Sequence, residues 1–314
     1  MKKTFLIFLT LFLFSCNDQV NQFVEVDPDY NIFMILQSDN YTQSGVITST
    51  YFGNGYDPTI NYTDPFVKNA LVKLYYKDTV KIFSEGKVPV NMFSTDSDTI
   101  SAYYNNDCYI EPDEVVELQA IINSERTAYS YVHMPDSLHF DLSETDKVIP
   151  PLEKNELFVK WQPEERDVIF LPRLRFRYYK EGKEYFKVVP IAYTEREDTS
   201  FSVYPHGSSF YYYTYPMESI NRAMEEISEG DFRKENYKIM EAYWEVSTLD
   251  ENLSTFYSAN YGSNANYDVS LNRVRFDNID GAKGILGGFT VSRLKIKFKA
   301  DYISSFGYIV GIPD

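Results

Sequence analysis

The chain has 314 residues and carries 46 acidic against 30 basic side chains, which gives a net charge of −16 at pH 7. Generic nucleic-acid binding is therefore excluded, because it depends on neutralising phosphates with lysine and arginine. Two cysteines are too few for a thiolate metal cluster. The length allows two domains of common size.

The first residues predict export and lipid anchoring. Lys2 and Lys3 precede an apolar run over 5–14 that is too short to span a bilayer as a helix. The run ends in Leu-Phe-Ser-Cys, which resembles the bacterial lipobox. This resemblance implies a signal peptide over 1–15, acylation of Cys16, and a flexible tether over 16–29. The alternative is an ordinary signal peptide followed by a chance cysteine.

The residue after the cysteine bears on location. It is Asn17, whereas an aspartate at this position retains proteobacterial lipoproteins in the inner membrane. The resemblance therefore implies lipid anchoring in the outer membrane, and leaves open whether the protein faces the periplasm or the cell surface. With Cys16 acylated, Cys108 has no intramolecular partner and is expected to be a small buried residue. No later apolar run reaches the roughly 18 residues of a membrane-spanning helix.

Residues 30–135 show the two-residue period of strands that bury one face. Apolar side chains alternate along 70–76 and along 116–122, and a continuous apolar run covers 32–36. Turn signals rich in Gly, Asp and Pro separate these runs. Short strands with frequent turns predict an antiparallel immunoglobulin-like β-sandwich, which we expect to end at Pro135.

Residues 136–314 predict a second sandwich. Leu157, Val159 and Trp161 fall on one strand face, and an inward tryptophan in this context resembles the core strands of fibronectin type III domains. Further strands are expected at 174–178, 185–191, 210–215, 239–248 and 289–298. The fold class is therefore all-β, with two immunoglobulin/fibronectin-III-like antiparallel β-sandwich domains.

One amphipathic helix interrupts the second domain. Apolar residues recur at spacings of three and four from Met217 to Ile227, after Pro216 and before Gly230. We expect this helix near 216–229, packed on a sheet edge or across the domain junction. A shorter helical turn is expected at 251–257.

The lipobox, the tether, the first sandwich and the stretch 278–288 together resemble the uncharacterised domain-of-unknown-function lipoproteins of the Bacteroidota. That stretch is Asn-Ile-Asp-Gly-Ala-Lys-Gly-Ile-Leu-Gly-Gly. Ala282 replaces the second glycine of the family pattern, and Leu286 replaces its aromatic residue. Such lipoproteins are often encoded beside TonB-dependent transporters, so the resemblance implies an outer-membrane β-barrel protein as partner. It carries no catalytic residues.

Aromatic residues are the strongest binding signal. They make up 17% of the chain, which includes 28 tyrosines, and they gather at 204–215. Strand alternation must turn some of these side chains outward, where tyrosine suits protein interfaces and sugar stacking. The candidates for contact with a partner or a glycan are Tyr211, Tyr212, Tyr213 and Tyr215. The alternative is that they cover a sandwich surface as good strand formers.

Two basic stripes are unusual in so acidic a chain. Each alternates with apolar residues and so lies on one strand face: Arg173, Arg175 and Arg177 in the first, Arg293, Lys295, Lys297 and Lys299 in the second. Cross-strand pairing with carboxylates is the structural explanation. The alternative is a surface that meets outer-leaflet phosphates or an acidic partner.

Candidates for catalysis are few. The three histidines form no His-Glu-x-x-His motif, and no Gly-x-Ser-x-Gly elbow occurs. The glycines at 281, 284, 287 and 288 lack the Gly-Lys-Ser/Thr ending of a phosphate loop, and we expect them to form bulges and a tight turn. The sequence predicts no catalytic residue, no metal site and no cofactor.

Two functional hypotheses follow. The first is a non-catalytic binding or accessory subunit of a TonB-dependent transporter or another envelope complex. The second is a surface lipoprotein that captures a glycan or another nutrient directly. An enzyme is not expected, because no pair of nucleophile and base can be named.

Overall fold

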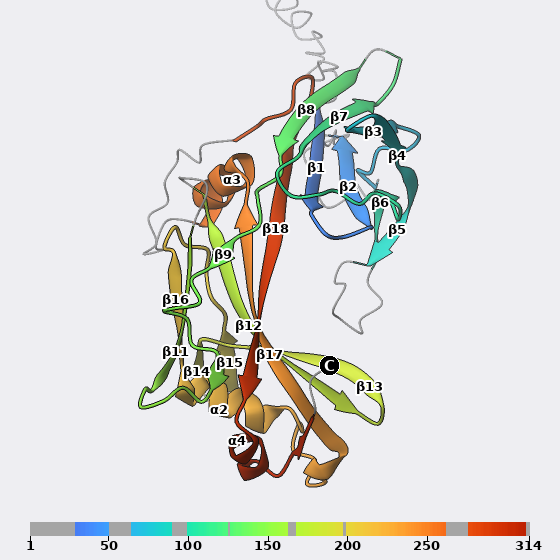
Figure 1. The fold of residues 1–314 in the computed structure, drawn as a ribbon. Helices are drawn as coiled ribbons and strands as arrows, with labels where there is room; N and C mark the ends of the chain where they lie inside the picture. Colours follow the sequence, from blue (N-terminus) through green and yellow to red (C-terminus); the bar gives the residue numbers. More distant parts are fainter. Residues whose placement is uncertain are drawn as a thin grey trace, which may run out of the picture.

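The computed structural model describes residues 29–49, 64–89, 99–124, 126–162, 168–196, 199–261 and 276–311 (Figure 1). The predicted signal peptide, Cys16 and the tether up to residue 28 lie outside these residues. The described part is all-β, as predicted, with helices only as short insertions between strands. Within the described ranges, no helix has the length and apolar character needed to cross a membrane.

The largest sheet runs through the whole length of the molecule (Figure 1). Its strands, in spatial order, are β13 (Lys183–Val189), β12 (Phe170–Lys180), β17 (Tyr237–Leu249), β18 (Lys283–Phe298), β1 (Tyr30–Gln37), β2 (Gln43–Ser49), β6 (Thr99–Asn105) and β5 (Ser84–Pro89). Most neighbouring strands are antiparallel, but β1 and β18 are parallel. Two short strands also pair in parallel: β10 (Val148–Ile149) with β18, and β19 (Ile309–Val310) with β17.

A four-stranded antiparallel sheet completes the first sandwich. Its strands, in spatial order, are β4 (Thr79–Ile82), β3 (Leu71–Tyr76), β7 (Val115–Ile121) and β8 (Thr127–His133). Alternate side chains, such as Leu74 and Leu118, pack against Leu36 of β1 in one core. The other face of this sheet is therefore turned away from the core.

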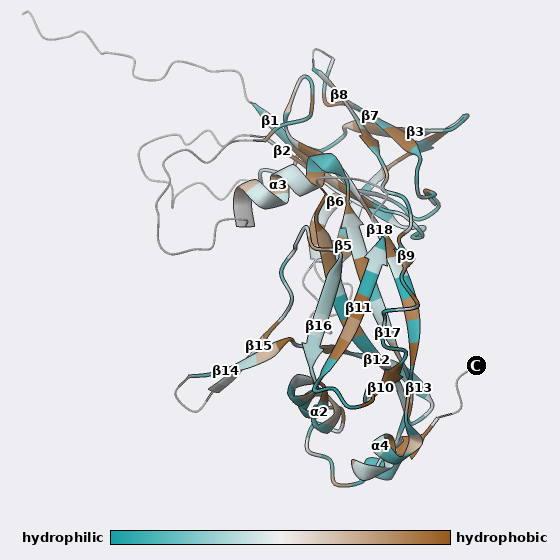
Figure 2. Ribbon diagram, turned by 60° about the vertical axis from the view of Figure 1, so that its left-hand side comes forward, coloured by the Kyte–Doolittle hydropathy of each residue, from teal (hydrophilic) through white to brown (hydrophobic). Residues whose placement is uncertain are grey.

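A three-stranded sheet forms the second sandwich with the opposite half of the large sheet. Its strands, in spatial order, are β16 (Tyr212–Pro216), β11 (Glu156–Gln162) and β9 (His139–Phe140). Trp161 points inward, as predicted, with its ring centroid 5.5 Å from that of Phe170. A hairpin of β14 (Ala192–Arg196) and β15 (Thr199–Val203) projects from this unit (Figure 2).

The described helices pack against the sheets of the second unit and against β18. Helix α2 (Met217–Glu226) confirms the helix expected near 216–229 and buries Ile220 and Met224 in the second core. Helix α3 (Glu251–Tyr261) confirms and extends the helical turn expected at 251–257 and packs Leu253 against Ile285 of β18. A short helix, α4 (Ala300–Ser305), and a 3₁₀ turn over Lys234–Asn236 were not predicted.

Strand β18 joins the two units. Its first half pairs with β1 and its second half with β17. Leu286 accordingly lies in the first core, whereas Ile296 lies in the second. The predicted boundary after Pro135 separates the residues of the two cores, except that the first core also takes Ile279 and Leu286 from the C-terminal part. The two units thus have separate cores but share one sheet.

The glycines of β18 allow close packing, which corrects the bulges expected from the sequence. Gly287 and Gly288 lie in regular register with β1. A Cβ atom on Gly288 would lie 2.4 Å from Met134 Sδ, and one on Gly287 would lie 2.9 Å from Leu253 Cβ. The missing side chains therefore let α3 and the segment after β8 approach the strand from its two faces.

Candidate functional site

The structure divides the four predicted tyrosines into buried and exposed residues. Tyr215 is buried, and its hydroxyl accepts a hydrogen bond from the backbone amide of Leu174 at 3.3 Å. Tyr213 is half-buried, with its ring centroid 5.6 Å from that of Tyr215. Burial raises the pKa of both hydroxyls. Tyr211 and Tyr212 are 43% and 51% exposed, so only these two are accessible to a partner.

Tyr212 belongs to an aromatic strip on the outer face of β16 and β11. Its ring centroid lies 5.9 Å from that of Phe158 and 6.0 Å from that of Phe210. We call these three residues the β16 strip. Lys160, which stands opposite Tyr212 in the strand register, is already paired with Glu144 at 2.6 Å. The strip is thus an apolar surface whose neighbouring cation is neutralised.

The two predicted basic stripes meet on one face of the large sheet, because β17 lies between β12 and β18. Glu245 of β17 accepts hydrogen bonds from both sides: from Arg175 at 3.0 Å and from Arg293 at 2.9 Å. Arg293 also contacts Asp39 at 2.7 Å. Arg173, which stands opposite Glu245 in the strand register, and Lys297, near the end of β18, are exposed and make no ion pair within the described ranges.

Glu241 lies in the same face and is fully buried. It contacts Arg177 at 2.7 Å and Lys295 at 3.6 Å, and accepts a hydrogen bond from the Tyr243 hydroxyl at 2.5 Å. Burial of Tyr243, followed by this hydrogen bond, raises the tyrosine pKa to about 12. We call Glu241 and Glu245, together with the four cations that contact them, the charge ladder. Cross-strand pairing, the structural explanation of the stripes, is confirmed for these residues.

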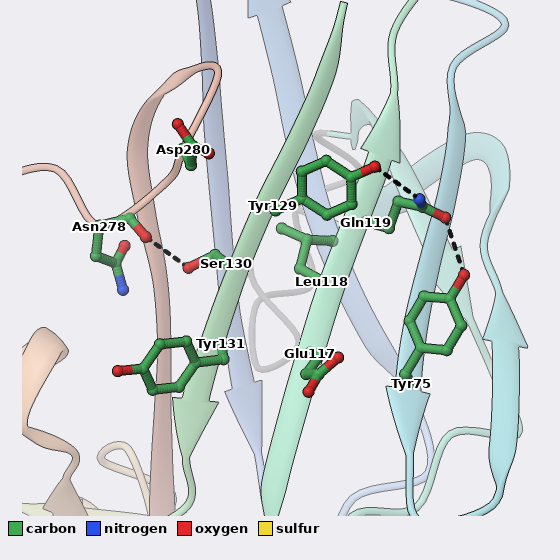
Figure 3. A pocket seen from close by; sticks show the side chains of 9 residues that line it. All are labelled: Tyr75, Glu117, Leu118, Gln119, Tyr129, Ser130, Tyr131, Asn278 and Asp280. Carbon is green, nitrogen blue, oxygen red and sulfur yellow. Dashed lines mark hydrogen bonds between the residues drawn. The ribbon is translucent and has the colours of Figure 1, made fainter.

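A groove of about 520 Å³ lies on the outer face of the four-stranded sheet (Figure 3). We call it the tyrosine groove. It is lined by Tyr75, Glu117, Leu118, Gln119, Tyr129, Ser130, Tyr131, Asn278 and Asp280. Strand alternation explains most of this set, because the residues between the core positions of β3, β7 and β8 must point outward.

The strand register orders the groove in rows. Tyr75 of β3 stands opposite Glu117 of β7, which stands opposite Tyr131 of β8. In the next row, Gln119 stands opposite Tyr129. A carboxylate and an amide therefore lie between aromatic side chains that belong to different strands.

The amide of Gln119 holds two of the rings in place. The Tyr75 hydroxyl donates to Gln119 Oε1 at 2.9 Å, and Gln119 Nε2 donates to the Tyr129 hydroxyl at 3.2 Å. Figure 3 shows the rings of Tyr75, Tyr129 and Tyr131 broadside over the strands, so that their faces are turned away from the sheet. Tyr129 and Tyr131 are 49% and 69% exposed. The groove thus presents aromatic faces whose orientation is set before any ligand arrives.

The loop before β18 forms the wall of the groove. The backbones of Asp280 and Tyr129 exchange two hydrogen bonds, at 2.8 and 2.9 Å, and the Ser130 hydroxyl donates to the Asn278 carbonyl at 2.6 Å. Gly281 has φ +80°, and a Cβ there would lie 2.4 Å from the Thr127 carbonyl oxygen. This glycine therefore permits the loop to approach β8 and carry Asp280 to the groove.

The side chain of Asn278 stabilises this loop. It donates to the Leu286 carbonyl at 2.7 Å and accepts from the Leu286 amide at 2.9 Å. Both ends of its amide are thus engaged by β18. The stretch that carries the family resemblance is therefore, in part, the wall of the groove.

The charged groups of the groove are both acidic. Glu117 and Asp280 are exposed carboxylates, and neither makes an ion pair with a described residue. Among the described residues, no basic side chain lines the groove. Lys73, half-buried and opposite Gln119 on β3, lies just outside it. The groove is therefore a negative, hydroxyl-accepting surface between aromatic rings.

Other reactive groups are in structural positions. His133 contacts Asp113 at 3.1 Å on the surface. Cys108 is buried in the first core, and burial raises the pKa of its thiol to about 11, so little thiolate forms at neutral pH. Across the described ranges, no group of three or more His, Cys, Asp or Glu residues is arranged to hold a metal ion.

A second hollow, of about 570 Å³, lies between α2 and β13. Its two cations both contact Glu226, whereas Glu225 and Glu229, which also line the hollow, make no ion pair with a described residue. Lys187 lies 2.7 Å and Arg222 3.5 Å from the carboxylate of Glu226, and the Arg222 guanidinium lies 3.9 Å from the Tyr193 ring centroid. The tyrosine groove is the stronger candidate, because it presents the exposed rings of Tyr129 and Tyr131 beside its carboxylates.

The sequence predictions missed the groove. Alternation along 70–76 and 116–122 already indicated that Tyr75, Glu117 and Gln119 would face outward. Tyr129 and Tyr131 are in an equally regular strand, but only the register of β7 with β8 places them beside Glu117 and Gln119. Of the predicted contact residues, Tyr211 and Tyr212 lie in or beside the β16 strip on the other unit, remote from the groove in the fold (Figure 1).

Neither a protein-family model nor a curated protein matches the chain. Among solved structures, it is similar to the crystal structure of DIP-gamma IG1+IG2, with 7% identity over 71% of this chain and 91% of that chain and a TM-score of 0.18. The full ectodomain (Ig1–Ig3) of mouse nectin-like molecule 4 shows 6% identity over 86% of this chain and 64% of that chain, with a TM-score of 0.18.

A chimeric titin Z1Z2-Z1Z2 tandem shows 11% identity over 87% of this chain and all of that chain, with a TM-score of 0.16. At TM-scores this low the similarities carry no argument about function. The all-β fold with sandwich-like sheets rests on the strand pairing described above.

Proposed function

We propose that the protein is a non-catalytic binding lipoprotein of the outer membrane, anchored through Cys16, that holds its ligand in the tyrosine groove. In this role it serves a TonB-dependent transporter or another envelope complex, as the family resemblance implies. The observation that carries the proposal is the preformed groove itself. Open aromatic faces beside exposed carboxylates that make no ion pair with a described residue are typical of ligand sites.

The position of the groove suits a tethered protein. Asp29, at the end of the predicted tether, is ion-paired with Lys283 at the start of β18. Lys283 follows directly on the loop that walls the groove. Thirteen residues from 17 to 29 extend at most about 45 Å, so Asp29 would remain within that reach of the membrane surface.

A second candidate is a protein that acts only by holding an outer-membrane β-barrel protein. The observation that favours it is the β16 strip, because exposed aromatic residues are frequent at interface hot spots. The strip and the groove lie on different sheets, so single substitutions separate the two candidates.

The anchor is tested with Cys16→Ala. We expect this variant to leave the membrane fraction or to accumulate unprocessed, whereas Cys108→Ala, the matched control, stays in the membrane. A Cys16→Ala variant that remains processed and membrane-bound would refute lipid anchoring.

The binding role is tested by purifying the full chain from detergent-solubilised membranes and identifying what accompanies it by mass spectrometry and sugar analysis. Tyr131→Ala and Tyr212→Ala are matched, because both remove an exposed tyrosine. Loss of a small-molecule or glycan ligand in Tyr131→Ala alone supports the groove. Loss of an identified stoichiometric β-barrel in Tyr212→Ala alone supports the second candidate. Turnover of the captured ligand by the pure protein would refute the non-catalytic role.

A further inference from the structure

We infer that the ligand of the tyrosine groove is an uncharged saccharide chain that lies across β3, β7 and β8, and that Gln119 is the residue that positions the rings beneath it. This inference rests on the proposed function of the groove, and it names the chemistry of the ligand.

The rings favour a sugar. Tyr75, Tyr129 and Tyr131 lie with their faces turned outward rather than edge-on (Figure 3). A flat aromatic face matches the C–H-rich face of a pyranose ring, which is both apolar and rigid. A cage for an organic cation would instead need rings that stand around the charge and face one another. No ring contact joins these three tyrosines, so each face is separately available.

The polar groups of the groove accept hydrogen bonds. Glu117 lies between Tyr75 and Tyr131 in the strand register, and Asp280 lies at the wall. A carboxylate only accepts, so each needs a donor from the ligand, and sugar hydroxyls supply such donors beside every ring. Asn278 is not available for this role, because its side chain is bonded to Leu286.

The charge of the described lining disfavours acidic chains. Its two carboxylates, with no cation among the described lining residues, would repel uronate, sulfate or phosphate groups, and burying like charges against each other costs affinity. Lys73 stands opposite Gln119 and lies outside the lining. A neutral chain meets no such barrier, and its binding should depend little on salt.

The spacing of the rings requires a chain rather than a single sugar. Tyr75 and Tyr131 stand two strand spacings apart, roughly 10 Å. This separation exceeds one pyranose ring, so one unit cannot stack on both. Affinity should therefore rise steeply between a monosaccharide and a chain of three or more units.

Gln119 acts through the tyrosines. Its amide joins the Tyr75 and Tyr129 hydroxyls, so both rings are held in the orientation that the ligand requires. Holding a site in its bound conformation reduces the entropy lost on binding. A glutamate at this position could accept from both tyrosine hydroxyls, whereas alanine could hold neither.

The test uses the full chain in detergent, calorimetry, and hexasaccharides of three kinds: neutral glucose, xylose, mannose and galactose chains, galacturonate chains, and glucosamine chains. We expect at least one neutral chain to bind, with affinity unchanged between 50 and about 500 mM NaCl and with its monosaccharide bound at least about tenfold more weakly. Tyr131→Ala should weaken binding about tenfold or more, and Tyr212→Ala should leave it unchanged.

The role of Gln119 is tested in the same assay. Gln119→Ala should weaken binding several-fold without changing the melting temperature, and Gln119→Glu should restore it. Equal binding by Gln119→Ala and the parent chain would refute the positioning role.

Several outcomes would overturn the ligand class. They are Tyr131-dependent binding of only galacturonate or only glucosamine chains, and no binding of any saccharide. The proposed function would survive these results if another ligand still accompanied the purified protein and was lost in Tyr131→Ala. Failure of both experiments would remove the groove as a binding site.

Discussion

The charge ladder and the tyrosine groove are both polar faces of β-sheets, built by the same alternation, yet they differ in whether their carboxylates are paired with cations. In the ladder, each glutamate contacts cations from both neighbouring strands. In the groove, Glu117 lies between two tyrosines and has no cation within the described part. A carboxylate paired with cations is engaged within the fold, whereas an exposed one without a cation beside it is available to a ligand.

The largest effect on stability is expected when a carboxylate of the charge ladder is removed. Glu241→Ala leaves Arg177 and Lys295 beside a buried gap, and we expect a loss of about 3–5 kcal/mol in the free energy of unfolding, measured with urea. Glu184→Ala is the control, because Glu184 contacts the same Arg177 at 3.1 Å but is more exposed. It should cost less than about 1 kcal/mol. Equal losses would show that burial of the ion pair does not determine its contribution to stability.

The second test concerns the wall of the groove. Gly281→Ala must strain a residue with φ +80° and place Cβ against the Thr127 carbonyl, so we expect a loss of about 1–3 kcal/mol. Gly182→Ala is matched, because its φ is +77° and no atom lies within 4 Å. The difference between the two losses in unfolding free energy measures the cost of the contact between the added Cβ and the Thr127 carbonyl. Faster amide exchange at Tyr129 and Asp280 in Gly281→Ala alone would place the effect at the groove.

The third test uses pH. Because the pKa of Tyr243 is raised from 10.0 to about 12, the folded chain keeps a proton between these values that the unfolded chain releases. Its contribution to stability is therefore complete below pH 10 and declines as the pH rises toward 12. Tyr243→Phe should cost about 1 kcal/mol at pH 7 and decline less steeply above pH 10. Parallel stability profiles from pH 9 to 12 would contradict this assignment.

Sequence patterns predicted individual helices and strands better than they predicted which strands pair with each other. Helix α2 was predictable because Met217, Ile220 and Met224 recur at helical spacing before a glycine. The parallel pairing of β1 with β18 was not, because the two strands lie at opposite ends of the chain and no turn sets their register. The same limit explains Gly287 and Gly288: a glycine suits a bulge or a close contact, and only the packing of α3 and Met134 decides between them.

For the tyrosine groove too, single outward-facing residues were predictable, but their arrangement was not. Alternation indicated outward positions for Tyr75 and Glu117, and composition indicated aromatic residues as the strongest binding signal. Density favoured the run at 204–215 as the candidate, because Tyr129 and Tyr131 are only two tyrosines in an ordinary strand. Their place in the groove depends on neighbours on β3 and β7, and cross-strand register is a tertiary property.

The smallest expected effect is the sharpest test of the comparison. Glu117→Gln keeps the size of the side chain and removes its charge, and because Glu117 contacts no described cation, the free energy of unfolding should change by less than about 0.5 kcal/mol. The same substitution in the ladder, Glu241→Gln, should cost several times more, since it leaves two cations under-compensated.

Both variants are measured by urea unfolding at low and high salt, and saccharide binding is measured on the Glu117 variant. If Glu117→Gln is as destabilising as Glu241→Gln, Glu117 is a structural residue and the two faces do not differ. If it is neutral for stability but weakens saccharide binding, the unsatisfied carboxylate is part of the ligand site.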